Sequence, residues 1–543
     1  MPQMTGGHAV VKALRAEGVD VVFGLPGAQI MHIYDAFYDT PEVRVITCRH
    51  EQTTVYMADG YARSTGKIGV ALIVPGPGAY NAGAALSTAF ATSSQVLVIS
   101  GQIDSKAMGK DFGALHEVRD QLEFMKPVLK WNDMVLKADA IPEAIHTAIR
   151  QLKTGRPRPV ELEIPPDILA TKADIDLVEP EEYPRPQADA SSIRAAAELL
   201  ASARRPVIWA GGGAVLSGAS AELTALAEQL NALVITTEQG KGAIPETHRL
   251  FAGTSSYGWG PAGDLISQAD VVLAVGSRLG AYPGSPPKVG QKLINLNVDP
   301  TEFNKTTPAA LGIAVDAKVG LRQLITALRN RTGQSAWEAS DASGARARVM
   351  ERMMEKGPQQ VVALKGIRDA IPEDGFVVPC ITNMGAWAAL AYDVLKPRTF
   401  ITSSYMGTLG YGFPTSLGVK VGNPDKAVVA LCGDGGFMYA IGELATAVQY
   451  GINVVAVIFN NRLFGASNRD QHLRFGGRVA GTELVTPDFV KLARSFGALG
   501  IKVARLEDTP DAIRRALKAK RPAVLEVDMP QDLNPPYYVR QGE

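Results

Sequence analysis

The sequence predicts an α/β protein built from three doubly wound parallel-sheet domains. Short, continuously apolar segments recur along the chain, and longer segments with apolar residues three and four positions apart lie between them. The first pattern is typical of parallel strands buried on both faces, and the second is typical of amphipathic helices. The third observation is length, because 543 residues are too many for one core and fit about three domains.

The first domain is expected over residues 1–173. Five apolar segments (VVFGL, VRVIT, GVALIV, QVLVIS and PVELEI) alternate there with helical stretches, as in a doubly wound unit. The acidic, proline-rich segment 174–192 follows and is expected to be a linker.

The middle domain is expected over residues 190–335. Its predicted strands are PVIWAGGG, ALVITT, VVLAVG and LINLNVD. Glycines 211–213 end the first of these strands, but the full dinucleotide-binding fingerprint is missing, so they predict no cofactor by themselves. A charged run at 340–360 marks the second boundary.

The third domain is expected over residues 360–528, followed by an irregular tail (529–543) that packs over a neighbouring surface. Within this domain, the apolar segments 427–432 and 453–459 flank a stretch with helical spacing. The order is therefore strand, crossover helix, strand, and such a crossover is right-handed.

Polar residues follow both of these strands. Asp434 lies at the end of the first and Asn461 at the end of the second, so both are expected at the same crevice. Gly433, Gly435 and Gly436 leave the backbone uncovered at a helix N-terminus, which favours an anion. A carboxylate and an amide oxygen suit Mg²⁺. We therefore expect a metal-bridged diphosphate; the alternative is a tight turn with an aspartate cap.

The spacing of these residues resembles a known family. Gly433-Asp434-Gly435, then 24 residues (436–459), then Asn460-Asn461 is similar to the thiamine-diphosphate motif of 2-oxoacid decarboxylases, acetolactate synthases and benzaldehyde lyase. The resemblance implies that the side chains of Asp434 and Asn461 and the backbone carbonyl of Leu463 bind Mg²⁺. It also implies pyrimidine-binding, middle and diphosphate-binding domains, in that order.

The resemblance places further cofactor contacts in two other segments. Glu51 is implied as the acid that meets the aminopyrimidine ring, and burial would favour its protonated form. His50 beside it is as well explained as a packed or solvated neighbour. Gly407 would offer its carbonyl to the ring, and Leu409 would support the bend of the cofactor, although many relatives carry Met at that position.

The resemblance also indicates which residues lie on the substrate side of the site. Gly27, Ala28 and Gln29 resemble the family's loop near the reacting carbon. His116 stands where acetolactate synthases and benzaldehyde lyase carry Gln. A histidine there could move a proton or donate to a substrate anion, or it could be a loop contact.

Composition limits the remaining possibilities. Lys plus Arg equals Asp plus Glu (55 each), so no basic surplus indicates nucleic acid or an anionic membrane. No apolar run reaches about 18 residues, and the N-terminus does not resemble a signal peptide. Three separated cysteines suggest reduced thiols in a cytoplasm. The segment 276–293 lacks the Arg-Phe-Asp-Asp-Arg stretch of flavin-containing acetolactate synthases, so we expect no FAD.

The expected function is a carboligase or decarboxylase that acts on a 2-oxoacid, a small carbonyl substrate. The alternative enzyme is a carbon–carbon lyase of acyloins or 2-hydroxyacyl-CoA. A catalytically silent binding paralogue is disfavoured, because Glu51 and the Asp434–Asn461 pair are both present. The family resemblance implies a homodimer or homotetramer with active sites between subunits.

Overall fold

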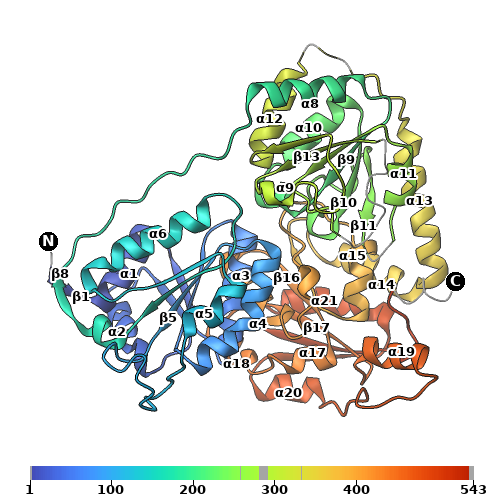
Figure 1. Cartoon of the computed structure of the whole chain (residues 1–543). Helices are drawn as coiled ribbons and strands as arrows, with labels where there is room; N and C mark the ends of the chain where they lie inside the picture. Colours follow the sequence, from blue (N-terminus) through green and yellow to red (C-terminus); the bar gives the residue numbers. More distant parts are fainter. Residues whose placement is uncertain (1–2, 257–258, 281–290, 330, 332, 537–543) are drawn as a thin grey trace.

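The computed structural model describes residues 3–256, 259–280, 291–329, 331 and 333–536. Three parallel sheets with covering helices follow one another along the chain, so the predicted fold class is confirmed. In Figure 1 the first sheet lies in the blue and cyan lobe, the second in the green lobe and the third in the orange lobe.

The first sheet has six parallel strands in the order β3-β2-β4-β5-β7-β6. Its four inner strands are buried on both faces, as their continuous apolar patterns predict, whereas the two edge strands are partly exposed. The strands are β2 (Val21–Gly24), β3 (Arg44–Thr47), β4 (Gly69–Ile73), β5 (Val96–Gly101), β6 (Trp131–Met134) and β7 (Val160–Ile164). The helices are α1 (Gly6–Ala16), α2 (Met31–Tyr38), α3 (Glu51–Thr65), α4 (Pro77–Thr92), α5 (Gln121–Met125), α6 (Ile141–Lys153) and α7 (Pro166–Ala170). A two-stranded antiparallel ribbon of β1 (Gln3–Thr5) and β8 (Lys172–Asp174) closes this lobe.

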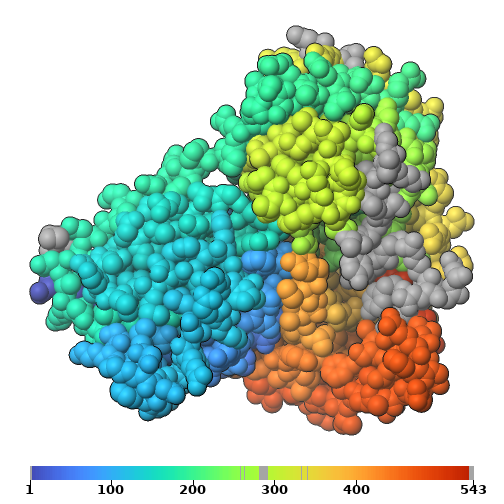
Figure 2. Space-filling model, in the orientation of Figure 1, coloured from blue at the N-terminus to red at the C-terminus, as the bar shows by residue number. Residues whose placement is uncertain are grey.

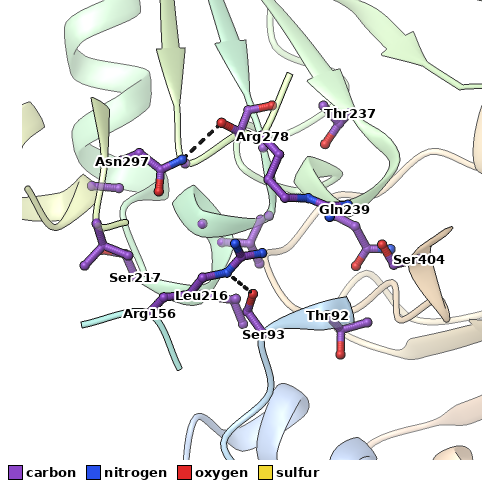
Figure 3. A pocket seen from close by; sticks show the side chains of 18 of the residues that line it. Thr92, Ser93, Arg156, Leu216, Ser217, Thr237, Gln239, Arg278, Asn297 and Ser404 are labelled. Carbon is purple, nitrogen blue, oxygen red and sulfur yellow. Dashed lines mark hydrogen bonds between the residues drawn. The ribbon is translucent and has the colours of Figure 1, made fainter. Parts of the chain in front are cut away.

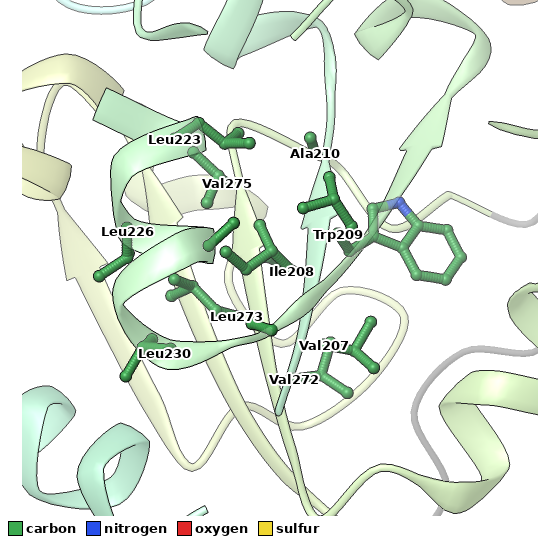
Figure 4. Packing of buried hydrophobic residues seen from close by; sticks show 14 of the residues in the cluster. Val207, Ile208, Trp209, Ala210, Leu223, Leu226, Leu230, Val272, Leu273 and Val275 are labelled. Carbon is green, nitrogen blue, oxygen red and sulfur yellow. The ribbon is translucent and has the colours of Figure 1, made fainter. Parts of the chain in front are cut away.

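The second sheet also has six strands, in the order β11-β10-β9-β12-β13-β14. Figure 4 shows leucines of α10 lying over β9 and β12 in its core. The strands are β9 (Pro206–Ala210), β10 (Leu233–Thr237), β11 (Phe251–Ser255), β12 (Val271–Val275), β13 (Lys292–Asn297) and β14 (Leu311–Ala314). The helices are α8 (Ala190–Ser202), α9 (Gly212–Leu216), α10 (Ser220–Leu230), α11 (Ala262–Gln268) and α12 (Ala317–Ala327). The two edge strands, β11 and β14, had no clear apolar signal in the sequence.

The third sheet has five parallel strands in the order β15-β16-β17-β19-β18. The strands are β15 (Phe376–Pro379), β16 (Val428–Gly433), β17 (Val455–Asn460), β18 (Leu499–Val503) and β19 (Ala523–Asp528). The helices are α13 (Ala339–Lys356), α14 (Pro358–Ala370), α15 (Asn383–Ala391), α16 (Gly412–Gly422), α17 (Asp434–Met438), α18 (Glu443–Gln449), α19 (Gly465–Arg474), α20 (Phe489–Ser495) and α21 (Thr509–Lys518). The single crossover helix expected between β16 and β17 is therefore two shorter helices, α17 and α18.

The segments between the sheets differ in structure. Residues 175–189 run as extended chain between the first two lobes, whereas most of the charged run at 340–360 forms helix α13, which packs against β11. The described part of the tail, 529–536, lies against α15 and the second lobe, where the indole N–H groups of Trp387 and Trp259 donate to its carbonyls. No helix in the described part of the chain is long and apolar enough to cross a membrane.

The first and third lobes meet through α3 and α16. A methyl group on Gly60 would lie 2.1 Å from the carbonyl oxygen of Thr415, and one on Gly418 would lie 1.9 Å from that of Met57. Glycine at both positions therefore lets the two helix backbones approach closely. One hydrophobic cluster runs through both lobes, so they form a continuous core.

Candidate active site

The carboxyl ends of β16 and β17 carry the first group of predicted site residues. The two strands are neighbours, and Gly433 at the end of β16 pairs with Phe459 in β17. Asp434 begins α17 immediately after β16, and Asn461 follows the last residue of β17. The structure therefore places both predicted side-chain ligands beyond the same edge of the sheet, as the sequence predicts.

Asp434 has the surroundings expected of a cation ligand. Its side chain is 2% exposed, and its Oδ2 atom has no hydrogen-bond partner among the described residues. Burial raises the pKa of Asp434, although backbone hydrogen bonds from Gly435 and Arg462 lower it. A buried carboxylate with an unused oxygen is costly unless a positive charge or a donor meets it. The site therefore fits a metal ion.

The two asparagines at the end of β17 have different environments. Asn460 is 4% exposed and donates through Nδ2 to Glu526 (3.0 Å) and Thr486 (3.1 Å), so it fastens the end of the strand. Asn461 is half-buried, and its Oδ1 accepts from the backbone N–H of Leu463 at 3.2 Å. An amide oxygen has a second lone pair, which leaves Asn461 able to ligate a hard cation.

The glycine turn after β16 lies against the segment 407–409. A methyl group on Gly436 would lie 3.9 Å from Cδ2 of Leu409, so the predicted wedge residue is next to the predicted diphosphate site. Gly407 has φ of +61° and open space around the position of a Cβ atom. Gly435 packs against Phe464, where a methyl group would lie 2.7 Å from the ring.

Glu51 occupies the corresponding edge of the first sheet. It is the first residue of α3 and is 8% exposed, so its predicted burial is confirmed. Its Oε2 accepts from Nδ2 of Asn81 at 2.9 Å, and a methyl group on Gly78 would lie 3.4 Å from its Cγ. His50 is exposed and caps α3 by accepting from the N–H of Gln52, which agrees with the solvated interpretation.

Asn81 is a site residue that the sequence analysis missed. The signal was the segment PGPGAYN (75–81), where a glycine-rich turn after β4 leads into α4. Asn81 lies on the first part of that helix, from which its amide reaches the carboxyl of Glu51.

The predicted substrate-side residues lie close to Glu51. Gln29 is 6% exposed and donates through Nε2 to the carbonyl of Leu115 at 2.9 Å, while its Oε1 has no partner among the described residues. His116 has φ of +68°, and its Nδ1 is buried without a hydrogen-bond partner there. Its carbonyl lies 2.5 Å from the position of a Cβ on Gly76. Two loops (27–29 and 114–117) and the start of α4 therefore meet at the edge of the first sheet.

Residues 27 and 28 complete this group. A methyl group on Gly27 would lie 2.3 Å from Cγ1 of Val74, so the loop backbone packs tightly on the end of β4. Ala28 is exposed at the start of a short 3-10 turn (Ala28–Ile30).

The two groups of residues belong to separate lobes of the chain. Within the described ranges, no hydrogen bond joins Glu51, Gln29 or His116 to Asp434 or Asn461. Exposed apolar side chains lie around both groups: Tyr80, Phe112, Leu115 and Phe124 on the first lobe, and Met438, Tyr439 and Val485 on the third. Each lobe therefore presents part of a site together with an apolar surface.

A separate cavity of about 1210 Å³ lies between the second lobe and the other two. Figure 2 shows the three lobes meeting near the centre of the drawn face. In Figure 3 the Arg156 side chain donates to Ser93, and Asn297 donates to the carbonyl of residue 277. The cavity is lined by six arginines: Arg63, Arg156, Arg158, Arg185, Arg278 and Arg398.

The expectation of no FAD is not tested by this cavity. Its lining reaches from glycines 211–213 after β9 to Gly407, and Arg278 lies 4.2 Å from the ring centroid of Tyr405. The expectation of no FAD was based on the segment 276–293. This segment falls partly outside the described residues, which omit 281–290. The absence of FAD stays a prediction, and the visible absorbance spectrum of the purified protein would test it.

Family comparisons cover all three lobes. Residues 4–124 match the thiamine pyrophosphate enzyme N-terminal TPP binding domain, and residues 193–324 match the central domain of these enzymes. Residues 381–527 match the C-terminal TPP binding domain. TPP, thiamine pyrophosphate, is the same compound as thiamine diphosphate.

The chain is also similar over nearly its whole length to individual proteins. It is 34% identical to a probable acetolactate synthase large subunit of Methanocaldococcus jannaschii, covering 96% of this chain and 92% of that protein. It is 34% identical to the acetolactate synthase large subunit of Haemophilus influenzae (100% and 97% covered). It is 35% identical to a probable 2-ketoarginine decarboxylase of Pseudomonas aeruginosa (95% and 92% covered). The chain therefore belongs to the family of thiamine-diphosphate-dependent enzymes that includes the acetolactate synthase large subunits.

Proposed function

We propose that this enzyme decarboxylates a 2-oxoacid and transfers the remaining acyl unit to a second carbonyl compound or to a proton. The observation that carries the proposal is the buried carboxylate of Asp434, which lies beside a glycine turn at the end of β16 and whose Oδ2 has no partner among the described residues. The names of its relatives, acetolactate synthases and a 2-ketoarginine decarboxylase, support a 2-oxoacid as the substrate class.

The cofactor would be held mainly by the third lobe. Asp434, Asn461 and the carbonyl of Leu463 would bind Mg²⁺, and the N–H groups of the turn at 433–436 would face the diphosphate. Gly407 and Leu409 would meet the aminopyrimidine ring and the bend of the cofactor. Bound thiamine diphosphate supplies the nucleophilic carbon that attacks the carbonyl group of the substrate.

The first lobe would control protons and orient the substrate. Glu51 would hold a proton against the aminopyrimidine ring, and the amide of Asn81 at 2.9 Å would fix the direction of its carboxyl group. The amide oxygen of Gln29 has no partner in the described part of the chain, and Gln29 would lie with Gly27 and Ala28 near the reacting carbon. The burial of Glu51 and its hydrogen bond from Asn81 support this role, because together they hold the carboxyl group in one position.

The complete site would form between two copies of the chain. The two groups of site residues share no hydrogen bond within the described part of one chain, and each lies beside exposed apolar side chains that a second copy would cover. A homodimer is the smallest assembly with complete sites, and a homotetramer is two such dimers. Full activity in a monomer, measured by light scattering at the assay concentration, would contradict this arrangement.

Product analysis tests the proposed reaction. With Mg²⁺ and thiamine diphosphate, the enzyme is offered a panel of 2-oxoacids, acyloins and 2-hydroxyacyl thioesters. We expect carbon dioxide from at least one 2-oxoacid, together with an aldehyde or a 2-hydroxy-ketone product. Turnover of acyloins or thioesters alone would instead identify the alternative lyase.

His116 is proposed to act on the substrate, because its buried Nδ1 has no partner in the described structure and its loop contacts the Gly76 turn. We expect His116→Gln to lower kcat/KM by about 10²-fold or more, the usual range for a general acid–base group. Cofactor retention should not change. The exposed residue His32, replaced by Gln, is the matched control. An unchanged kcat/KM in His116→Gln would make this histidine a loop contact only.

A further inference from the structure

Two glutamates lie buried side by side in the first sheet. Glu161 and Glu163 stand two residues apart on β7, so their side chains point to the same face, and both are 0% exposed. Both oxygens of Glu161 and Oε1 of Glu163 have no hydrogen-bond partner among the described residues. Two ionised carboxylates in such a position would be very costly, because each is desolvated and each repels the other.

The polar groups around the pair are mostly neutral. Gln102 donates to Oε2 of Glu163 at 2.8 Å, and Asn132 on β6 faces Glu161. The amide of Gln121 on α5 also lowers the pKa of Glu163, and the carboxylate of Asp120, which caps the same helix, raises it. Burial raises the pKa of Glu163 to about 7. Burial, and to a smaller extent the charge of Glu163, raises the pKa of Glu161 well above its ordinary value.

The pair is connected to the predicted catalytic acid through Gln121. The Oε1 atom of Gln121 accepts from the backbone N–H of Gly76 at 2.8 Å, and its Nε2 donates to Ser100 at 2.9 Å. Gly76 caps α4, which carries Asn81, and Asn81 donates to Glu51. Gly76 also contacts the carbonyl of His116. Gln121 therefore stabilises, through Gly76, the turn that contacts His116 and leads to Asn81, the hydrogen-bond partner of Glu51.

We propose that Glu161 and Glu163 form a proton-holding pair that positions the Glu51 and His116 loops, so that loss of its proton lowers activity. This inference rests on the proposed function for its kinetic readout. When the Glu163 carboxyl is neutral, the Gln121 side chain keeps its hydrogen bonds with Gly76 and Ser100. An ionised carboxylate only accepts hydrogen bonds, so it attracts the Gln121 amide and weakens the bond from Gly76. Glu161 and Glu163 are thus positioning residues and do not touch the substrate.

The pair should also give the fold a particular pH dependence. A Glu carboxyl in the unfolded chain titrates near 4.5, whereas Glu163 in the folded chain titrates near 7. The folded state therefore binds the proton more tightly, so stability is greatest below the lower value and decreases as the pH rises through the higher one. The unfolding temperature of the wild type should fall more between pH 5 and about 8 than that of Glu163→Gln, which cannot titrate.

The test compares wild type, Glu163→Gln and the exposed control Glu143→Gln as cofactor-loaded enzyme. In the wild type we expect kcat/KM to fall as the pH rises above about 7. In Glu163→Gln this decrease should disappear, while retention of thiamine diphosphate should be equal in all three. His116→Gln should keep the decrease in kcat/KM that is caused by Glu163. The double variant, His116→Gln with Glu163→Gln, should lose this decrease.

Infrared difference spectroscopy provides a readout that does not depend on activity. At pH 6 the wild type should show the carbonyl band of a buried protonated carboxylic acid, and Glu163→Gln should lose part of that band. If no 2-oxoacid turns over, the proposed function fails, but this band and the unfolding temperatures still test the pair. A wild type without the band, or a Glu163→Gln variant that keeps both pH effects, would overturn the inference.

Discussion

Asp434→Ala is expected to abolish retention of thiamine diphosphate at micromolar concentration. The physical reason is that Asp434 is the one charged side chain in the proposed ligand set, and its Oδ2 is buried without another partner in the described structure. Without this charge, the Mg²⁺ that links the diphosphate to the protein has only an amide and a carbonyl oxygen from the chain. The measurement is the thiamine diphosphate that stays with the protein after gel filtration in Mg²⁺-containing buffer.

Stability measurements separate this effect from misfolding. Removing the carboxylate relieves the burial of its unpaired Oδ2 but leaves the backbone N–H groups of Gly435 and Arg462 without their acceptor, so the cofactor-free variant should unfold near the wild-type temperature. Mg²⁺ with thiamine diphosphate should stabilise the wild type by about 2.7 kcal/mol at 100 times its Kd and should not stabilise the variant. The exposed residue Asp425, replaced by Ala, should behave like the wild type. Wild-type retention in Asp434→Ala would exclude the proposed ligand set.

Glu51→Gln is expected to bind the cofactor but to slow its activation by about 10²–10⁴-fold, the range for a general acid–base group. The diphosphate is held by the third lobe, so retention should be near normal. Gln keeps the size of the side chain and a bond to Asn81 but carries no titratable proton. The measurement is exchange of the reactive thiazolium proton for deuterium in the loaded enzyme, followed by NMR after acid quenching.

The control for this variant is Glu42→Gln, because Glu42 is exposed and pairs only with the exposed Arg15 at the surface in the described structure. Glu42→Gln should exchange at the wild-type rate. The same rate in Glu51→Gln would show that another group activates the cofactor. A variant that loses the cofactor altogether would instead place Glu51 among the groups that bind it.

The parts of the fold that the sequence predicts well have strong local patterns. Buried parallel strands such as β16 and β17 are continuously apolar, so both their positions and the polar residues at their ends could be read directly. The edge strands β11 and β14 were missed, because both are short and contain small or polar residues (FAGTS and LGIA) that give no continuous apolar signal. The break between α17 and α18 was missed because the apolar spacing continues through the turn. The limits 1–173, 190–335 and 360–528 stay predictions.

The residues of the candidate site were likewise predicted only in part. Motif spacing predicted Asp434 and Asn461, because each lies at the carboxyl end of a buried strand, whereas Glu51 was implied by the family resemblance. Asn81 and Gln121 were not predicted, because their importance comes from hydrogen bonds to residues 30 and 45 positions away in the chain. Such long-range contacts leave no periodic or motif signal in a single sequence. The roles of Gly27, Ala28, Gln29 and His116 stay proposals until a substrate is known.

Cofactor-dependent decarboxylation is tested by measuring the release of carbon dioxide from 2-oxoacids with and without cofactor. The enzyme is first stripped of metal and cofactor, and the assay is then run with Mg²⁺ and thiamine diphosphate together, with each alone, and with neither. Release is expected only when both are present, and Asp434→Ala should give background release under every condition. Wild-type release without added thiamine diphosphate, or equal release by the wild type and Asp434→Ala, would contradict this expectation.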